Sequence, residues 1–310
     1  MTELTVIMPV YNAMPYLPAA IDSILGQTLR EFEFLIVDDG STDGSGDYLR
    51  SLRDPRVRLL STDRLGPSGA RNHLIALVQT PYCAIMDADD VAVNTRFELQ
   101  LAFMRENSEV VLAGSQISLI AEDSTIRATP FPTKHDDILA ALLNGRAVVC
   151  NSSCFLRSNA VRAAGGYRLQ YAEDTDLFLR LARHGKLVNL DAALLNYRIH
   201  LGSTFMTNDP SYKCFESYSI ASFRALEKGE PEPDLSQFVE AWDRCGHLTT
   251  LARAIDRWSA VQYRRAILEL GKGRRLAATA KMAFAAGCRP RTSAVQIVAR
   301  LRRMFAQAGA

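Results

Sequence analysis

The chain has 310 residues, of which 48% are hydrophobic and 23% charged, and its formal net charge is +2. This composition is typical of a soluble globular protein with one large core, and the small net charge gives no sign of nucleic-acid binding. The N-terminus has no basic segment before an apolar stretch, and no apolar run reaches the ~20 residues of a membrane-spanning helix, so we expect neither a signal peptide nor a transmembrane span.

Strand and helix patterns alternate through the first 120 residues. The expected strands cover residues 5–11, 32–40, 57–61, 82–90 and 110–120. The expected helices cover residues 17–27, 44–52, 69–79 and 96–105, with Asp43 and Ser68 as candidate caps of the second and third. This alternation predicts βαβ units and a Rossmann-like, mainly parallel sheet flanked by helices. Right-handed crossovers then place the carboxyl ends of the strands at one edge, where ligands bind.

The rest of the chain is less regular. Residues 118–198 have the patterns of helices at 135–143 and 175–184 and of strands at 148–156 and 187–197. After residue 210 the segments are mostly helical in pattern, and residues 227–234 resemble a linker. The six cysteines form no CxxC pair, which indicates buried free thiols and a reducing compartment.

Two expected strands end in clusters of carboxylates, Asp38-Asp39-Gly40 and Asp87-Ala88-Asp89-Asp90. Both clusters should lie at the same edge of the sheet, and crowded carboxylates need a cation or hydrogen-bond donors nearby. Hard oxygen ligands suit Mg²⁺ or Mn²⁺, usually together with substrate phosphates. The alternative is that these acids are helix caps and turn formers, a role that suits Asp90.

Two common phosphate-binding motifs are absent from the sequence. No GxGxxG follows the first strand, which argues against a dinucleotide-binding Rossmann domain, and no GxxxxGK[ST] is present. The first strand ends instead in Pro9-Val10-Tyr11-Asn12, which offers an aromatic ring and backbone groups.

An ordered set of segments resembles the family 2 glycosyltransferases, which have the GT-A fold. The segments are VIMPVYNA (6–13), LIVDDGSTDGS (35–45), GPSGARNHLIALVQTPYCAIMDADD (66–90), R-x-x-L-Q (96–100), GGYRLQYAEDTDLFLRLARHG (165–185) and YRIHLGST (197–204). The resemblance covers residues 5–204, about two thirds of the chain. It implies a catalytic domain at 1–210, with a nucleotide-sugar half at about 1–117 and an acceptor half at about 118–210. A helical region at 211–310 would follow it.

The resemblance also implies roles for individual residues. Asp174 would be the general base for the acceptor hydroxyl, with Glu173 and Tyr167 on the acceptor side. Asp87 and Asp89 would bind Mn²⁺ or Mg²⁺ as a DXD pair, and His200 would be a late metal or diphosphate contact. The donor would be held by Pro9, Tyr11, Asn12, Asp38, Asp39, Arg71, Asn72, Asp87 and Ala88, with Asp39 on the base.

Elementary chemistry is consistent with these roles. Inverting transfer needs a base on one face of the sugar and a stabilised diphosphate leaving group on the other, and a metal supplies the second. Arg71 lies near the start of an expected helix, where anions are favoured. Two structural readings stay open: Glu173 and Asp174 are also suitable acids for a helix N-terminus, and His200 is also suitable as a packing residue.

The C-terminal segment is strongly basic, since Glu269 is the only acidic residue after Arg257. Val295, Val298, Leu301 and Phe305 recur at helical spacing among arginines, a pattern that suits an anionic membrane surface. The same pattern also suits a helix that packs on the catalytic domain or on a second subunit, as in a homodimer.

We therefore expect a cytoplasmic transferase, peripheral to the inner face of the plasma membrane if its tail binds lipid. It would move a sugar from a nucleotide-diphosphate donor, UDP by resemblance, to a glycan or lipid-linked acceptor in bacterial surface polysaccharide synthesis. The alternatives are a sugar nucleotidyltransferase and a nucleotide-sugar or glycan-binding protein without transfer activity. PVYNAMPYL (9–17), in place of a glycine-rich loop, argues against the nucleotidyltransferase.

Overall fold

The computed structural model describes residues 2–121, 124–128, 130–200 and 211–244, together with 255, 258–259, 261–262, 265–269 and 272–287. The chain forms two compact units. The first contains Met1–Ser118, Pro130–Tyr197 and Lys213–Pro233, and the second contains Leu119–Thr129, Arg198–Tyr212 and Asp234–Ala310. Helix α8 (Ser211–Glu227) thus belongs to the first unit from Lys213 onward, although the sequence analysis assigned it to the C-terminal region.

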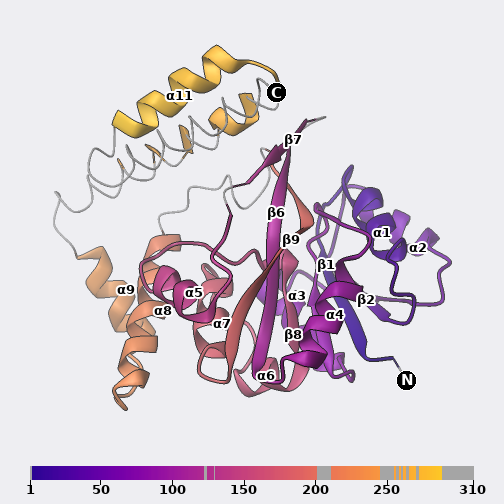
Figure 1. The fold of residues 1–310 in the computed structure, drawn as a ribbon, viewed down its shortest axis with the longest axis horizontal. Coiled ribbons are helices and arrows are strands. Elements are labelled where there is room, and N and C mark those ends of the chain that lie inside the picture. The colour runs from indigo at the N-terminus through magenta and orange to yellow at the C-terminus, as the bar shows by residue number, and fades with distance from the viewer. Residues whose placement is uncertain are drawn as a thin grey trace. The chain divides into compact units, whose positions relative to one another are not determined.

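The described strands form one mixed sheet, in the order β3-β2-β1-β4-β8-β6-β9-β5, with β7 paired to β6 (Figure 1). Strands β1 to β4 run parallel, which confirms the expected βαβ half, whereas β8 runs antiparallel to both β4 and β6. The strand bounds are β1 (Leu4–Val10), β2 (Glu33–Asp38), β3 (Val57–Ser61), β4 (Tyr82–Ile85), β5 (Val91–Ala92), β6 (Val110–Ala121), β7 (Ser124–Arg127), β8 (Phe155–Arg157) and β9 (Lys186–Arg198).

Helices cover both faces of the sheet in the first unit. Buried apolar residues of α3, α5, α6 and α7 pack in one cluster with Ile7, Leu35 and Val37, and those of α1, α2 and α4 pack in another with Val6, Met8 and Ile36. The alternation along β1 and β2 therefore builds one core on each face. The helix bounds are α1 (Leu17–Leu25), α2 (Ser45–Ser51), α3 (Gly66–Leu77), α4 (Arg96–Glu106), α5 (His135–Leu142), α6 (Ser158–Ala163) and α7 (Glu173–Leu181).

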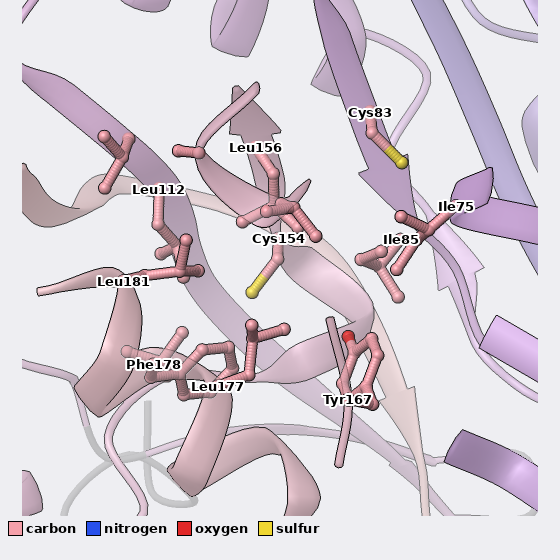
Figure 2. Packing of buried hydrophobic residues seen from close by; sticks show 14 of the residues in the cluster. Ile75, Cys83, Ile85, Leu112, Cys154, Leu156, Tyr167, Leu177, Phe178 and Leu181 are labelled. Carbon is pink, nitrogen blue, oxygen red and sulfur yellow. The ribbon is translucent and has the colours of Figure 1, made fainter. Parts of the chain in front are cut away.

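Helix α7, which carries the expected base, is anchored by the first of these cores. Its Leu177, Phe178 and Leu181 are at most 1% exposed and pack in the same cluster as Leu112 of β6 and Leu156 of β8 (Figure 2). Apolar burial on this scale stabilises by roughly 1.5–3 kcal/mol per large side chain. The first turn of α7 is therefore built on a rigid support.

The sheet register brings the two acidic clusters together. Strand β1 lies between β2 and β4, with Val10 opposite Asp38 and Ile7 opposite Ile85. Both clusters thus flank the carboxyl end of β1, as the sequence predicts. Pro9 fits within β1 because β4 pairs with it only as far as Ile7, so no ladder needs an N–H group from Pro9 on that side.

The expected strand at 148–156 is wrong in most of its length. Residues Asn151–Ser153 form a 3₁₀ turn, and only Phe155 to Arg157 form a strand. Serine hydroxyls account for the difference, since the Ser153 hydroxyl donates to the Cys150 carbonyl at 2.8 Å and competes with sheet pairing. Cys83, Cys150, Cys154 and Cys214 are buried free thiols, as expected.

The second unit contains α9 (Leu235–Asp243) and α11 (Arg275–Gly287). Asp234 caps α9 by accepting the Gln237 N–H, and Trp258 packs edge-on against Phe284 at 4.8 Å between ring centroids. No helix within the described residues is long and apolar enough to cross a membrane. The basic helical pattern at residues 295–305 lies outside the described residues.

Candidate active site

The loops that follow β1 and β2 are tied together by side chains. The Thr42 N–H donates to Asn12 Oδ1 at 2.7 Å, the Asn12 N–H donates to Ser41 Oγ at 3.0 Å, and the Met14 N–H donates to Asp43 Oδ2 at 2.8 Å. Asn12 has a left-handed backbone, φ +47°, which asparagine tolerates well. Its side-chain oxygen thus holds the loop at this edge, and its predicted contact with the donor stays a prediction.

Asp39 is 2% exposed and holds the start of α3. Its Oδ1 accepts from the Thr62 hydroxyl at 2.8 Å and from the Leu65 N–H at 2.6 Å, and its Oδ2 accepts from the Gly66 N–H at 2.8 Å. This carboxylate supplies the N-terminal acceptor that Ser68 was expected to supply. The Ser68 hydroxyl donates instead to the Leu169 carbonyl at 2.7 Å.

Asp38 ends β2, and Tyr11 follows the end of β1. Asp38 is 7% exposed, and its Oδ1 accepts from the Ser41 N–H at 3.0 Å. Tyr11 is 41% exposed, and the guanidinium carbon of Arg64 lies 3.2 Å from the centre of its ring. An exposed aromatic ring beside a cation offers a stacking surface at the sheet edge.

Arg71 of α3 connects the two halves of the site. Its Nη2 lies 2.7 Å from Asp87 Oδ1, its Nη1 lies 3.2 Å from Glu173 Oε1, and its guanidinium lies 5.4 Å from the centre of the Tyr167 ring. The side chain is 9% exposed, and these two carboxylates raise the pKa of Arg71 against the opposing effect of burial. The structure therefore brings Arg71, Asp87, Glu173 and Tyr167 together, as the sequence predicts.

Asn72, the next residue, has a structural role. Its Nδ2 donates to the Tyr167 carbonyl at 2.5 Å, and its Oδ1 accepts from the Tyr167 N–H at 2.8 Å. Both polar atoms of the Asn72 amide thus bond to the backbone of Tyr167. These bonds hold Tyr167 where its ring lies near the Arg71 guanidinium. In the described structure Asn72 positions Tyr167, and its predicted contact with the donor stays a prediction.

The turn at Gly165-Gly166 makes this clamp possible, which gives a first testable prediction. Gly166 has φ +65°, and a Cβ added there would lie 2.4 Å from Asn72 Oδ1. Gly166→Ala is expected to lower the free energy of unfolding by about 2–4 kcal/mol, through backbone strain and a disturbed clamp. Gly165→Ala is the matched control, because Gly165 has φ +80° but open space around it. Equal losses in urea titrations of the two variants would contradict the clamp.

The DXD segment turns immediately after β4. The Asp87 N–H donates to Ser152 Oγ at 3.0 Å, Ala88 is 8% exposed and Asp90 is 1% exposed. Asp89 is half-buried within the turn. Asp87 and Asp89 offer hard oxygen ligands of the kind that Mg²⁺ and Mn²⁺ prefer.

The donor set fits a metal that is completed by its substrate. Within the described part of the chain, no three His, Cys, Asp or Glu side chains are grouped as a ready metal site. Mg²⁺ is commonly held by one or two carboxylates and by substrate phosphates, so two aspartates in a turn fit this type of site and do not fit an all-protein cage.

Arg96 is bonded to the end of β4, just before the DXD segment. This structural role was not expected from the sequence. Arg96 is 0% exposed, and its Nη2 donates to the carbonyls of Ile85 at 2.9 Å and Cys154 at 3.3 Å. Its Nε donates to Gln100 Oε1 at 3.0 Å, and burial lowers the pKa of Arg96 to about 10. The R-x-x-L-Q spacing places both side chains on one helix face, which is the signal from which this pair could have been found.

The first turn of α7 carries Glu173 and Asp174, the residues predicted to face the acceptor. Ala172, which precedes the helix, has a left-handed backbone with φ +50°, an uncommon conformation for a residue with a side chain. Asp174 Oδ1 accepts from the Thr175 N–H at 2.7 Å. Burial and the nearby Asp174 raise the pKa of Glu173 to about 7, and burial also raises the pKa of Asp174.

These raised pKa values predict a pH dependence. The two carboxyls titrate as a pair, and the folded protein keeps a proton on the pair below about pH 7. A base must be deprotonated, so we expect kcat/KM to fall as pH falls through about 7. Because the folded-state pKa values lie above the unfolded ones, the free energy of unfolding should also decrease as pH rises from about 4.5 to about 7.

Glu173→Gln separates the two members of the pair. The variant removes a neighbouring negative charge, so the acid limb of the pH–rate profile should move to lower pH. An unchanged limb would contradict the pairing of these carboxyls.

His200 is half-buried, lies two residues after the end of β9 and belongs to the second unit. The described structure gives it no place relative to the aspartates of the first unit. Its role as a metal or diphosphate ligand therefore stays a prediction.

The family model "Glycosyl transferase family 2" matches residues 5–164. The chain belongs to this family. A relative that supports the assignment is the O-antigen biosynthesis glycosyltransferase WbnJ of Escherichia coli, which is 30% identical over 71% of this chain and 88% of its own length. The E. coli enzyme WfaP, a UDP-Glc:alpha-D-GlcNAc-diphosphoundecaprenol beta-1,3-glucosyltransferase, is 28% identical over 66% of this chain and 80% of its own.

Two further relatives are longer than the matched region. Uncharacterized glycosyltransferases of Haemophilus influenzae and Rickettsia felis are each 29% identical, over 64% and 76% of this family 2 chain. The match spans 66% and 38% of their own lengths.

Solved structures confirm the GT-A fold. TarS of S. aureus in complex with UDP-GlcNAc has a TM-score of 0.63 at 15% identity, covering 92% of this chain and 91% of that one. The mannosyltransferase PcManGT of Pyrobaculum calidifontis, in complex with GDP-Man and Mn²⁺, has a TM-score of 0.52 at 16% identity, covering 99% and 81%.

Proposed function

We propose that this family 2 glycosyltransferase catalyses inverting, metal-dependent transfer of a sugar from a nucleoside diphosphate to a hydroxyl group. One observation carries the proposal: a single buried guanidinium, that of Arg71, contacts Asp87 of the DXD segment and Glu173 beside the expected base. The donor-side and acceptor-side carboxylates therefore share one site, at the edge where an open α/β sheet binds ligands.

Some of these residues would act on the nucleophile and others on the leaving group. Asp174 accepts the proton of the acceptor hydroxyl while the hydroxyl oxygen attacks the anomeric carbon. The bond from that carbon to the diphosphate oxygen breaks on the opposite face. Asp89 and Asp87 would hold Mn²⁺ or Mg²⁺, which would neutralise the departing diphosphate. Arg71 adds a positive charge at the same place, and Tyr11 offers a stacking surface for the base.

Buried carboxyls with raised pKa values suit a base that works near neutral pH. Asp174 is assigned as the base because it occupies the second position of the acidic pair in the family pattern. Glu173 is bonded to Arg71, so its charge is directed toward the donor side.

UDP is the proposed carrier, and a glycan or lipid-linked sugar is the proposed acceptor. The substrates named for WfaP and the UDP-GlcNAc bound to TarS support this choice. The Mn²⁺ found with PcManGT supports the metal. The O-antigen assignment of WbnJ supports a role in cell-surface polysaccharide synthesis.

A lipid-linked acceptor would place the protein at the inner face of the plasma membrane, with its basic C-terminal segment as the contact. Sedimentation of the full chain with liposomes tests this, because an electrostatic contact should pellet with anionic vesicles and should be released by salt. Equal pelleting with neutral vesicles would remove the proposed contact. Sedimentation velocity without lipid tests the alternative, a homodimer.

The decisive test of activity is a screen of nucleotide-sugars by thermal shift with Mn²⁺, followed by an assay of nucleoside diphosphate release. A transferase should release the diphosphate slowly by hydrolysis and faster when a suitable acceptor is added. A sugar-binding protein would be stabilised without release, and a nucleotidyltransferase would release pyrophosphate from a nucleoside triphosphate.

A further inference from the structure

A buried ion network lies behind the acceptor side of the site. Asp176 of α7 is 1% exposed, and its carboxylate accepts from two arginines. Arg168 Nη2 donates to its Oδ1 at 2.9 Å, and Arg180 Nε donates to its Oδ2 at 2.9 Å. No role is expected from the sequence for any of these three residues.

The two arginines extend the network to neighbouring segments. Arg180 also donates to the carbonyls of Ala164 and, at 2.7 Å, Gly166. Arg168 also donates to Glu232, at 3.0 Å to Oε1 and 2.6 Å to Oε2. The network therefore joins three segments: the turn before Tyr167, the start of α7 and the segment that follows α8.

Two of these segments border residues that the proposed reaction needs. Asp176 is in the first turn of α7 with Glu173 and Asp174. The Gly166 carbonyl directly precedes Tyr167, whose ring lies against Arg71. The network thus holds the helix turn that carries the expected base and the residue whose ring lies against Arg71, whereas the carboxylate of Asp87 is paired with Arg71.

The energetics of buried ion pairs indicate that this network fixes the arrangement of the segments more than it stabilises the fold. The cost of removing a carboxylate and two guanidinium groups from water offsets much of their attraction, so a well-packed apolar cluster would stabilise a fold about as well. Charged groups with fixed directions do select one arrangement of the segments they join. At this place, the joined segments include the first turn of α7, which carries Asp174.

We infer that Asp176, Arg168, Arg180 and Glu232 are positioning residues for the transfer step, acting through Asp174 and Tyr167. The inference rests on the proposed function, and it makes Glu232, in the segment expected to be a linker, part of the catalytic unit. Misplacement of a reacting group by about 1 Å lowers rates by up to ~10²-fold, so even the outer arm should affect turnover.

The test uses two variants that keep Asp176. Arg180→Lys keeps the charge but loses the bonds to the turn, and Glu232→Ala removes the outer arm, which is 29% exposed. We expect kcat to fall roughly tenfold in the first and roughly threefold in the second. The KM for the donor and the Kd for UDP with Mn²⁺ should stay within about twofold, because the network bonds to the turn before Tyr167, to α7 and to the segment after α8, and Asp87 is held by Arg71.

Arg157→Gln is the matched control for loss of stability. Arg157 is a part-buried arginine that donates to the carbonyls of Val110 at 2.8 Å, Met104 at 2.7 Å and Asn107 at 3.0 Å. The residue opposite it, Tyr82, begins β4, whereas the DXD segment follows the other end of that strand. This variant should lower the melting temperature and leave kcat per folded molecule unchanged.

Amide hydrogen exchange gives a readout that does not depend on activity. Arg180→Lys should speed exchange in residues 164–176 and leave the loops after β1 and β2 unchanged. Wild-type kcat in both variants, or unaltered exchange in 164–176, would overturn the positioning role. Absence of transfer by the wild-type protein would instead refute the proposed function, and exchange would still test the network.

Discussion

Asp174→Asn is expected to lower kcat by roughly 10²–10⁴-fold, the usual contribution of a general base, and to leave the Kd for UDP with Mn²⁺ unchanged. Asparagine has nearly the shape of aspartate and keeps an oxygen for the Thr175 N–H, so α7 should keep its start. The loss should therefore be chemical and not structural. Stopped assays of diphosphate release, combined with calorimetric titration of UDP, measure the two quantities separately.

Asp137→Asn is the control for this substitution. Asp137 is also an acid in the first turn of a helix, α5, but it is exposed. Its replacement should change the helix by only a few tenths of a kcal/mol and leave turnover unaltered. Near-normal turnover in Asp174→Asn would move the base to another residue, with Glu173 as the first candidate.

Asp89→Ala is expected to abolish the dependence of UDP binding on divalent metal. The substitution removes an oxygen ligand, and even the loss of a residue that only orients a metal ligand costs 10–100-fold in affinity. The ratio of the Kd for UDP without and with Mn²⁺ should therefore fall to about one. Calorimetric titrations with Mn²⁺ and with a chelator measure that ratio.

Asp191→Ala is the matched control for loss of one negative charge, since Asp191 is exposed on β9. Its metal dependence should equal that of the wild type. A metal effect that persists in Asp89→Ala would assign the cation to other ligands.

The parallel half of the fold and the position of the site are predictable because they depend on local patterns. An apolar run that ends in acids and glycine predicts both a buried strand and the end of that strand where functional residues lie. The register of β1 between β2 and β4 then brings Asp38 and Asp87 to the same edge. Periodicity and the switch-point rule are sufficient for this step.

Other features depend on contacts between residues far apart in the chain. The amide of Asn72 clamps Tyr167, which is 95 residues away, and no local pattern states that pairing. A fully buried arginine such as Arg96 contradicts the usual preference of its residue type, so hydropathy places it at the surface. The residues that position the site are for this reason harder to find from sequence than the residues that react.

The end of the first unit is another place where local sequence patterns do not predict a long-range contact. Helical periodicity identifies α8 as amphipathic, but it does not say which surface the helix covers. The Arg168–Glu232 ion pair shows that the chain after α8 returns to the segment between Tyr167 and α7. Residues 227–234 have the composition of a linker, and that composition gives no sign of the contact between Glu232 and Arg168.

The most direct test of the account is a crystal structure with UDP and Mn²⁺, with the metal located by its anomalous scattering. We predict that Mn²⁺ lies within coordination distance of the Asp89 carboxylate and of the diphosphate, with Asp174 facing the open side of the same site. Mn²⁺ and UDP bound away from Asp89, or at separate places, would contradict the claim that these aspartates hold a metal-bridged diphosphate.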